Sequence, residues 1–258
     1  SFSSLKMWNE CPFKFKLQYL EGLRGFRGNE YTAFGSAVHN VCESMVEAKY
    51  KNNTVITEDV ARDSFKKDFL KNLDELKEDG IEIRSNMVSD MLSQGKDLLP
   101  HIMPALQEYF GDFELVSTEE SLMEEVEDSD LFYKGFIDLA LKTPDGKYHI
   151  IDWKTCSWGW DARRRSEKMT TYQLTYYKYF FAKKHNVDLE NIETHFALLK
   201  RTAKANKVEF FRVTSGAKKI DNAIKLLNHA LYNVDKGFFI KNRLSCKSCE
   251  FYKTEYCP

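Results

Sequence analysis

The stretch "GFIDLALKTPDGKYHIIDWKT", residues 135–155, decides the fold of this chain. It contains two runs of β-branched, aromatic and aliphatic residues, at 136–142 and 148–155, and both have the composition of strands. The residues Thr-Pro-Asp-Gly at 143–146 separate the two runs and favour a tight turn. The stretch is therefore predicted to form an antiparallel β-hairpin.

The hairpin also determines where its charged side chains point. Residues two apart on a strand share a face, so Asp152 and Lys154 are expected on the same face of the second strand. Ile151 and Trp153 then face the other way. Asp138 lies in the first strand, and pairing of the two strands brings it beside Asp152 and Lys154.

The composition is that of a globular protein in water. Of its residues, 43% are hydrophobic and 30% are charged. A length of 258 residues is enough to bury one good core, or at most a core with an appended subdomain. No apolar run approaches the roughly 20 residues of a membrane span, and the start of the sequence lacks the apolar centre of a signal peptide. We expect an intracellular, cytoplasmic protein with no membrane contact.

The charges are balanced in total but separated along the chain. The formal net charge of -1 gives no reason by itself to expect a nucleic-acid partner. Acidic residues crowd between 119 and 130, whereas basic residues recur in "DARRRSEK", "LLKRTAKANK" and "GAKK". Such runs are most often solvated surfaces, so they need support from other features.

Hydrophobic periodicity divides the chain into a helical part and a mixed part. Helices are predicted at 3–20, 33–51, 57–79, 87–110, 166–185 and 215–237, and strands at 113–125, 131–141, 147–155, 193–200 and 207–213. No repeat or linker appears, so residues 1–258 are expected to form one α/β domain. Its parts are a mainly helical region (1–112), a core (113–213) and a C-terminal helix with a Cys-rich tail (214–258).

Asp138, Asp152 and Lys154 have the chemistry of a hydrolytic metal site. Two carboxylates on adjacent strands can hold a hard cation such as Mg²⁺ or Mn²⁺, and a nearby ammonium group can orient an attacking water or help to deprotonate it. That arrangement suits phosphodiester hydrolysis. Taken alone, an ordinary Asp-Lys pair on a surface hairpin explains the three residues equally well.

Other residues fit the same site, although each has a structural explanation of its own. His39, in "FGSAVHNVCESM", could be a further metal ligand, but a lone helical histidine is more often structural. Gln173 and Tyr177, in "YQLTYYKY", share a helix face. Glu119 or Glu120, on the strand before the hairpin, could complete the acidic cluster, and the metal-ligand set predicted here includes Glu120.

The order of these motifs resembles the RecB-like branch of the PD-(D/E)XK nuclease superfamily. "GSAVH" comes first, then "GFIDL", then "IIDWKT", then "QLTYY", and the resemblance covers most of the chain. It implies a restriction-endonuclease-like core, with a central mixed β-sheet flanked by helices. It also implies an active site at the positions of His39, Asp138, Asp152 and Lys154, with Gln173 and Tyr177 beside it. This chain has Asp152 where many members have Glu.

The resemblance implies a Mg²⁺- or Mn²⁺-dependent deoxyribonuclease, and in particular an exonuclease acting on single-stranded DNA or DNA ends. Its partners would be DNA and proteins of recombination, repair or replication, with the oligomeric state left open. A catalytically silent DNA-binding or scaffolding subunit and an RNA-directed nuclease remain alternatives. Trp158 and Trp160 could stack on unpaired bases or could equally be packed in the core.

Four of the six cysteines form a pattern. Cys246, Cys249 and Cys257 cluster as C-x2-C-x7-C, and Cys11 lies near the N-terminus, whereas Cys42 and Cys156 stand apart. In an intracellular protein such spacing favours a metal site over disulfides. Zinc and iron-sulfur both fit the residues themselves.

One early cysteine followed by three late ones resembles the iron-sulfur RecB-like nucleases of CRISPR adaptation, of AddB-type subunits and of several phage proteins. The resemblance implies that Cys11, Cys246, Cys249 and Cys257 hold a [4Fe-4S] cluster in a structural role, with Zn²⁺ as the alternative. It also admits a phage-encoded protein.

Overall fold

The computed structural model describes residues 1–23, 25–127 and 129–258, so Asp128 of the acidic run lies outside the described residues. At its centre is a five-stranded sheet with the strand order β1-β2-β3-β4-β5. The strands are β1 (Glu114–Glu125), β2 (Phe132–Lys142), β3 (Tyr148–Cys156), β4 (Ile192–Lys200) and β5 (Val208–Val213). Neighbours are antiparallel except β3 and β4, which run parallel. The sheet is therefore mixed, and the predicted hairpin is its β2-β3 pair.

The helices precede, interrupt and follow the sheet. The α-helices are α1 (Phe2–Glu10), α2 (Pro12–Phe15), α3 (Glu30–Tyr50), α4 (Glu58–Glu78), α5 (Ser85–Leu98), α6 (Ile102–Phe110), α7 (Ala162–Ser166), α8 (Lys168–His185) and α9 (Ala217–Asp235). A π-helical turn, η1 (Lys16–Leu20), follows α2. Short 3₁₀ turns are η2 (Leu99–His101), η3 (Leu189–Asn191) and η4 (Arg243–Ser248). None of the helices in the described ranges is long and apolar enough to cross a membrane.

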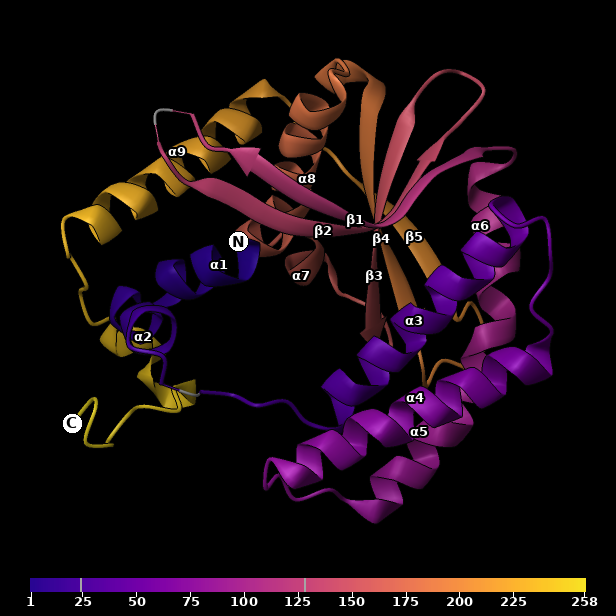
Figure 1. The fold of residues 1–258 in the computed structure, drawn as a ribbon, viewed down its shortest axis with the longest axis horizontal. Helices are drawn as coiled ribbons and strands as arrows, with labels where there is room; N and C mark the ends of the chain where they lie inside the picture. The colour runs from indigo at the N-terminus through magenta and orange to yellow at the C-terminus, as the bar shows by residue number, and fades with distance from the viewer. Residues whose placement is uncertain (24, 128) are drawn as a thin grey trace.

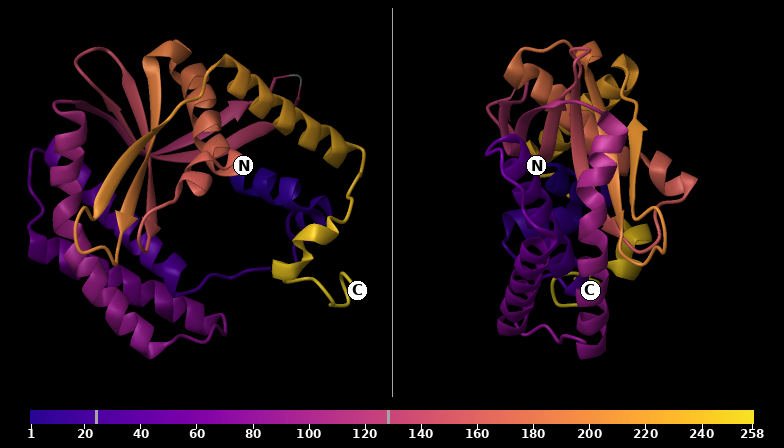
Figure 2. Two further views of the ribbon diagram at one scale, coloured as in Figure 1. Left: turned by 180° about the vertical axis from the view of Figure 1, so that it is seen from behind. Right: turned by 90° about the vertical axis from the view of Figure 1, so that its right-hand side faces the viewer.

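Each face of the sheet has its own hydrophobic core. Helices α1, α8 and α9 pack on one face, where Ile150 and Phe196 lie among residues such as Tyr176 and Phe180. Helices α3 to α6 pack on the other face, where Ile151 and Trp153 meet residues of these helices. Figures 1 and 2 show the two helical layers with the sheet between them. The alternation of Ile150 and Ile151 between the two cores confirms the face assignment made from the sequence.

The N-terminal helix is shorter than predicted. The sequence predicts one helix over 3–20, but α1 ends at Glu10, and Cys11 is extended, with φ -159° and ψ 108°. Pro12 explains the break, because the residue before a proline is pushed out of the α region. The break turns the chain at Cys11, and α2 begins with Pro12 at its first position.

The helix predicted over 166–185 is α8, which begins two residues later than predicted and is preceded by the short helix α7. Helix α7 ends at Ser166, and α8 begins after Glu167, whose side chain accepts hydrogen bonds from the backbone N–H groups of Met169 and Thr170. Glu167 is extended, with ψ 129°, and it therefore separates the two helices while capping the second.

Candidate active site at the divergence of β2 and β3

The site lies where two neighbouring strands separate. The β2-β3 ladder runs from the Lys142-Tyr148 pair to the Leu139-Ile151 pair and continues no further among the described residues. Strand β2 then stays paired with β1, while β3 stays paired with β4 as far as Cys156. Asp138 and Asp152 are the next residues beyond the last pair, one on each strand. The divergence thus leaves two carboxylates at the mouth of a gap in the sheet.

Asp138 and His39 face each other on the β2 side of this gap. The Asp138 Oδ2 atom accepts a hydrogen bond of 2.7 Å from the backbone N–H of Trp153, and His39 Nδ1 lies 3.8 Å from the same oxygen. Burial, together with the charge of Asp152, raises the pKa of Asp138 well above its usual value. Burial lowers the pKa of His39 to about 4. The imidazole is therefore neutral at neutral pH, which is the form that binds metal ions.

Asp152 is almost completely buried, with 1% of its surface exposed, and its two oxygens have different surroundings. Oδ1 accepts a hydrogen bond of 2.8 Å from Gln173 Nε2, which also lies 3.1 Å from the Tyr177 hydroxyl oxygen. Oδ2 lies 2.6 Å from Lys154 Nζ but accepts no well-aligned hydrogen bond from the described residues. A buried carboxylate oxygen that accepts no hydrogen bond is a suitable ligand for a cation.

Two glycines allow the flanking helices to approach the site. A Cβ atom on Gly35 of α3 would lie 3.3 Å from Thr155 Oγ1 at the end of β3, so this glycine lets the helix that carries His39 pack closely. A Cβ atom on Gly135 of β2 would lie 3.1 Å from the Tyr177 ring. Both approaches are tight, and they set the positions of α3 and α8 around the gap.

The two glutamates that could complete the acidic cluster have different roles. Glu120, predicted as a metal ligand, is buried and lies 2.8 Å from Lys184 Nζ and 2.6 Å from His185 Nε2, at the end of α8. On α8, Gln173 contacts Asp152 and His185 contacts Glu120. These two helix residues are twelve positions apart, which is about 18 Å along the helix axis, so Glu120 lies far from Asp152. The assignment of Glu120 is therefore corrected, since its carboxylate is already bound by Lys184, His185 and the Ser117 hydroxyl, away from the gap.

Glu119 is the glutamate at the gap. It lies opposite Asp138 between the paired residues Thr118 and Glu120, and its φ of 43° places it in the left-handed region that non-glycine residues rarely adopt. Burial and the nearby charges of Glu43 and Asp152 raise its pKa. Such strained residues often occur at functional sites.

Glu43 was not singled out from the sequence. It follows His39 by four positions on α3, which places both side chains on one helix face. Its charge contributes to the raised pKa of Glu119, so it lies near the same cluster. The four-residue spacing in "HNVCE" is the signal that could have found it.

The residues present suit a hydrated divalent cation. His39, Asp138 and Asp152 do not bring three ligand atoms within 4.8 Å of one another in the described chain. Mg²⁺ usually keeps several waters and binds through one or two carboxylates, so it needs no complete protein cage. The carboxylate oxygens of Asp138 and Asp152, with neutral His39, are therefore an adequate donor set.

A separate cluster at the other end of β3 and β4 has its own hydrogen bonds. His149 Nδ1 lies 3.1 Å from His195 Nε2, and Glu193 completes a group of ligand atoms within 4.8 Å. The outer ring nitrogens contact the hydroxyls of Thr143 and Tyr109, and Glu193 is paired with Lys147 and Arg212. These bonds can all be satisfied by neutral imidazoles, and the two cations beside Glu193 oppose metal binding. We interpret the cluster as a structural link between the strands.

The four predicted cysteines surround one small cavity where the two ends of the chain meet. Cys11, Cys246, Cys249 and Cys257 all line this cavity, together with Lys14 and Lys241. The backbone N–H of Asn242 donates to Cys11 Sγ at 3.4 Å, and Lys14 forms an ion pair of 2.7 Å with Glu250. Figure 1 shows α2 beside the C-terminal segment. Cys42 and Cys156 lie elsewhere in the fold, as expected from their positions in the sequence.

The two tryptophans that follow β3 have different environments. Trp160 is buried, with its ring packed against Phe196 and Phe211, so it belongs to the core. Trp158 is 75% exposed and is the one whose ring is accessible from solvent.

The fold and this site define a class of protein, and comparison with known sequences gives the same class. The sequence model of the PD-(D/E)XK nuclease superfamily matches residues 1–258, so the chain belongs to this superfamily. Its members use divalent metal ions, and the chain is accordingly a nuclease by class. No curated protein matches the sequence.

Solved structures show the same fold at low sequence identity. A crystal structure of a candidate exonuclease from Eubacterium rectale is similar with a TM-score of 0.60 and 14% identity, over 97% of this chain and 85% of that one. A structure of the protein SSO0001 has a TM-score of 0.35 and 14% identity, over 63% of this chain and 72% of that one. The first comparison supports the fold, whereas the second is too distant to carry weight.

Proposed function

We propose that this protein is a metal-dependent deoxyribonuclease that acts as an exonuclease on single-stranded DNA or DNA ends. The observation that carries the proposal is the pair of carboxylates, partly buried Asp138 and buried Asp152, at the point where β2 and β3 separate, with Lys154 beside them. Two carboxylates and a lysine at such a gap can bind a hard cation and a phosphate group together.

Each residue has a role that follows from its surroundings. Asp138 and Asp152 would bind Mg²⁺ or Mn²⁺, assisted by His39 and by Glu119 in place of Glu120. The bound cation would supply an activated water and would offset the charge that develops on the phosphate. Lys154 would position that water or stabilise the phosphate oxygens.

Gln173 and Tyr177 position the carboxylate rather than bind the cation in this proposal. Gln173 donates to Asp152 Oδ1, and its amide also lies beside the Tyr177 hydroxyl. This arrangement fixes the carboxylate orientation and directs Oδ2 toward the gap.

The proposal includes a structural [4Fe-4S] cluster at the four cysteines. Zinc holds its sulfur ligands at about 2.3 Å, which places them about 3.8 Å from one another. A [4Fe-4S] cluster binds one thiolate on each of its four irons, and the four cysteines that line this one cavity supply that number. Lys14 and Lys241 at the cavity would offset the negative charge of four thiolates.

A substrate panel tests the activity. Purified protein is expected to degrade end-labelled single-stranded or duplex DNA from an end in the presence of Mg²⁺ or Mn²⁺. Asp152→Asn and Lys154→Ala should each lower turnover by at least about a hundredfold with the fold retained, because each removes a group at the reacting phosphate.

The matched controls are Asp145→Asn and Lys147→Ala, which have the same Asp-x-Lys spacing just before β3. Their activity should stay close to that of the wild type. If the wild type cleaves no polynucleotide, the chain is a silent DNA-binding or scaffolding protein. If it cleaves only RNA, the deoxyribonuclease assignment is wrong.

A further inference from the structure

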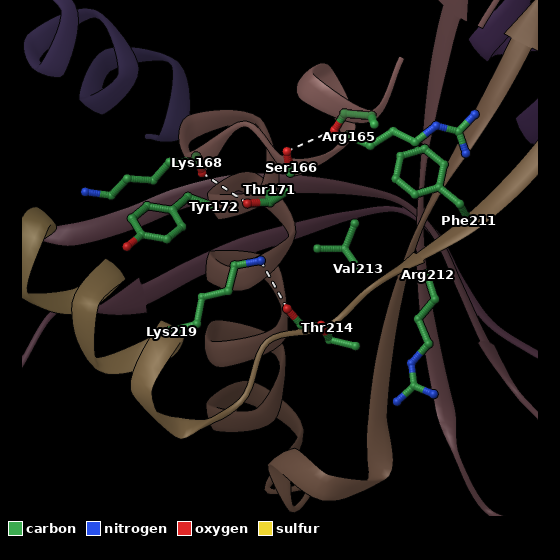
Figure 3. Close-up of a pocket in the computed structure, with 11 residues that line it drawn as sticks. Arg165, Ser166, Lys168, Thr171, Tyr172, Phe211, Arg212, Val213, Thr214 and Lys219 are labelled. Atoms are coloured by element: carbon green, nitrogen blue, oxygen red, sulfur yellow. Dashed lines mark hydrogen bonds between the residues drawn. The ribbon is translucent and has the colours of Figure 1, made fainter. Parts of the chain in front are cut away.

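A basic pocket lies on the flank of α8 that faces β5 and α9. It has a volume of about 710 Å³ and is formed by α7, the first turn of α8, β5 and the start of α9. Four basic residues line it, namely Arg165, Lys168, Arg212 and Lys219, and no described acidic residue does. Figure 3 shows these side chains around the cavity, together with Ser166, Thr171 and Thr214, which carry hydroxyl groups.

Two of the four cations have carboxylate partners outside the pocket. Arg165 pairs with Glu209 at 2.6 Å, and Arg212 pairs with Glu193 at 3.1 Å. These pairs hold the two guanidinium groups in place at the pocket wall. Arg165 also lies over the Phe211 ring, which fixes its plane.

The other two cations are free to bind an anion. No described carboxylate lies within ion-pair distance of Lys168 or Lys219. Lys219 Nζ donates to the backbone oxygen of Thr214 at 3.0 Å, and Lys168 Nζ lies over the Tyr172 ring. An ammonium group has three donors, so both lysines keep hydrogen-bonding capacity for a ligand.

The pocket and the metal site share one helix. Thr171 lines the pocket, and Gln173, two positions later on α8, binds Asp152. Two positions correspond to about 200° around a helix and about 3 Å along its axis. The pocket and the two carboxylates therefore lie on opposite flanks of the same turn of α8.

We propose that this pocket binds backbone phosphates of the same nucleic-acid strand that is cleaved at Asp138 and Asp152, a few nucleotides away from the scissile bond. The proposal rests on the nuclease function proposed above, because that function supplies the polyanionic substrate. A cavity of this size, with several cations and hydroxyl groups and no acidic side chain among its described lining residues, matches a phosphate backbone. Lys168 and Lys219 bind the phosphates directly.

Binding without cleavage is the first test. A fluorescent single-stranded oligonucleotide is titrated with the protein in EDTA at several salt concentrations. The double variant Lys168→Ala/Lys219→Ala should bind roughly tenfold more weakly, and the slope of log K against log salt should fall by about 1.4, or about 0.7 for each phosphate that is no longer neutralised. The control Lys218→Ala/Lys225→Ala also removes two positive charges from this region but leaves the pocket intact, and it should bind like the wild type.

Cleavage of two substrates separates this inference from the nuclease proposal. The small diester bis(p-nitrophenyl) phosphate can reach the metal site without filling the pocket, so the double variant should hydrolyse it at the wild-type rate. On single-stranded DNA the same variant should show a raised KM with little change in kcat. If the wild type hydrolyses neither substrate, the nuclease proposal fails.

Two results would overturn the pocket assignment itself. One is equal DNA binding and equal KM in the pocket variant and its control. The other is displacement of the oligonucleotide by a deoxynucleoside monophosphate at the same nucleotide concentration, since that would identify the pocket as a product site rather than a strand site.

Discussion

The surroundings of the Asp152 carboxylate suit the cation binding that we propose for it. Gln173 holds one carboxylate oxygen, while the other faces Lys154 and the gap between the strands. Burial would ordinarily exclude such a charge, and the nearby ammonium group offsets that cost. The adjacent glutamates of β1 have different surroundings, because Glu119 lies near the charge of Asp152 whereas Glu120 is paired with Lys184 and His185.

Exchange of each glutamate for glutamine distinguishes their roles. Glu119→Gln should lower turnover at limiting Mg²⁺ by roughly tenfold and raise the Mg²⁺ concentration needed for half-maximal activity, because a negative oxygen ligand is removed. Glu120→Gln should leave turnover unchanged and lower the free energy of unfolding by about 1–3 kcal/mol, because Lys184 and His185 lose a buried partner. The reverse pattern would restore Glu120 as the metal ligand.

Among the elements on the α3 side of the sheet, an ion pair between buried Glu30 and exposed Arg84 joins two helices. Glu30, in the first turn of α3, is 3% exposed and accepts hydrogen bonds from the backbone N–H, Nε and Nη2 of Arg84 at the start of α5. The Arg84 side chain holds the pKa of Glu30 at about 2. This link fixes the start of the helix that carries His39.

The lowered pKa of Glu30 predicts how this link depends on pH. The pKa of the Glu30 carboxyl is 4.5 in the unfolded chain and about 2 in the folded protein. Its contribution to the free energy of unfolding is therefore complete above about pH 4.5 and is lost as the pH falls toward 2. Glu30→Gln should therefore destabilise the protein by about 1–3 kcal/mol at pH 7, and the difference should shrink across that interval. Denaturant unfolding at several pH values measures it.

The matched control is Glu58→Gln, which affects an exposed pair with Arg62 in the first turn of α4. An exposed ion pair contributes little to stability, so the free energy of unfolding of this variant should stay within about 0.5 kcal/mol of the wild-type value at every pH. A Glu30→Gln effect that does not change with pH would contradict the role of the charge.

In the whole molecule, the N-terminal and C-terminal segments of the chain contact each other. Cys11 lies next to Asn242, and Lys14 is paired with Glu250, so residues more than 230 positions apart in the sequence are in contact. Closing so long a loop through a metal centre removes conformational entropy from the unfolded chain. The proposed cluster would therefore stabilise the fold without taking part in cleavage.

Cysteine variants test this closure. Protein purified without oxygen should be brown and should contain iron and sulfide, and Cys11→Ala should lose both and unfold at a lower temperature. Cys156→Ala, at the end of β3, should keep the iron and serves as the control. Zinc without sulfide would contradict the iron-sulfur cluster but keep the four-cysteine site, whereas iron retained in Cys11→Ala would contradict the four-ligand set.

The hairpin, the face that Asp152 shares with Lys154 and the mixed α/β class follow from short stretches of sequence. Turn residues and strand periodicity act over a few positions, so they can be recognised without a structure. The break at Cys11 was also encoded locally, in the proline that follows it, although the helical spacing of the apolar residues concealed it.

Which glutamate lies near Asp152, and where the basic residues gather, depend on the packing of the folded chain. Glu119 and Glu120 are indistinguishable in the sequence, and the backbone turn at Glu119 and the position of His185 on α8 separate them. Likewise, Arg165, Lys168, Arg212 and Lys219 come from four segments and meet only because α7, α8, β5 and α9 pack around one pocket. Packing between distant segments sets these positions, and no short stretch of sequence contains that information.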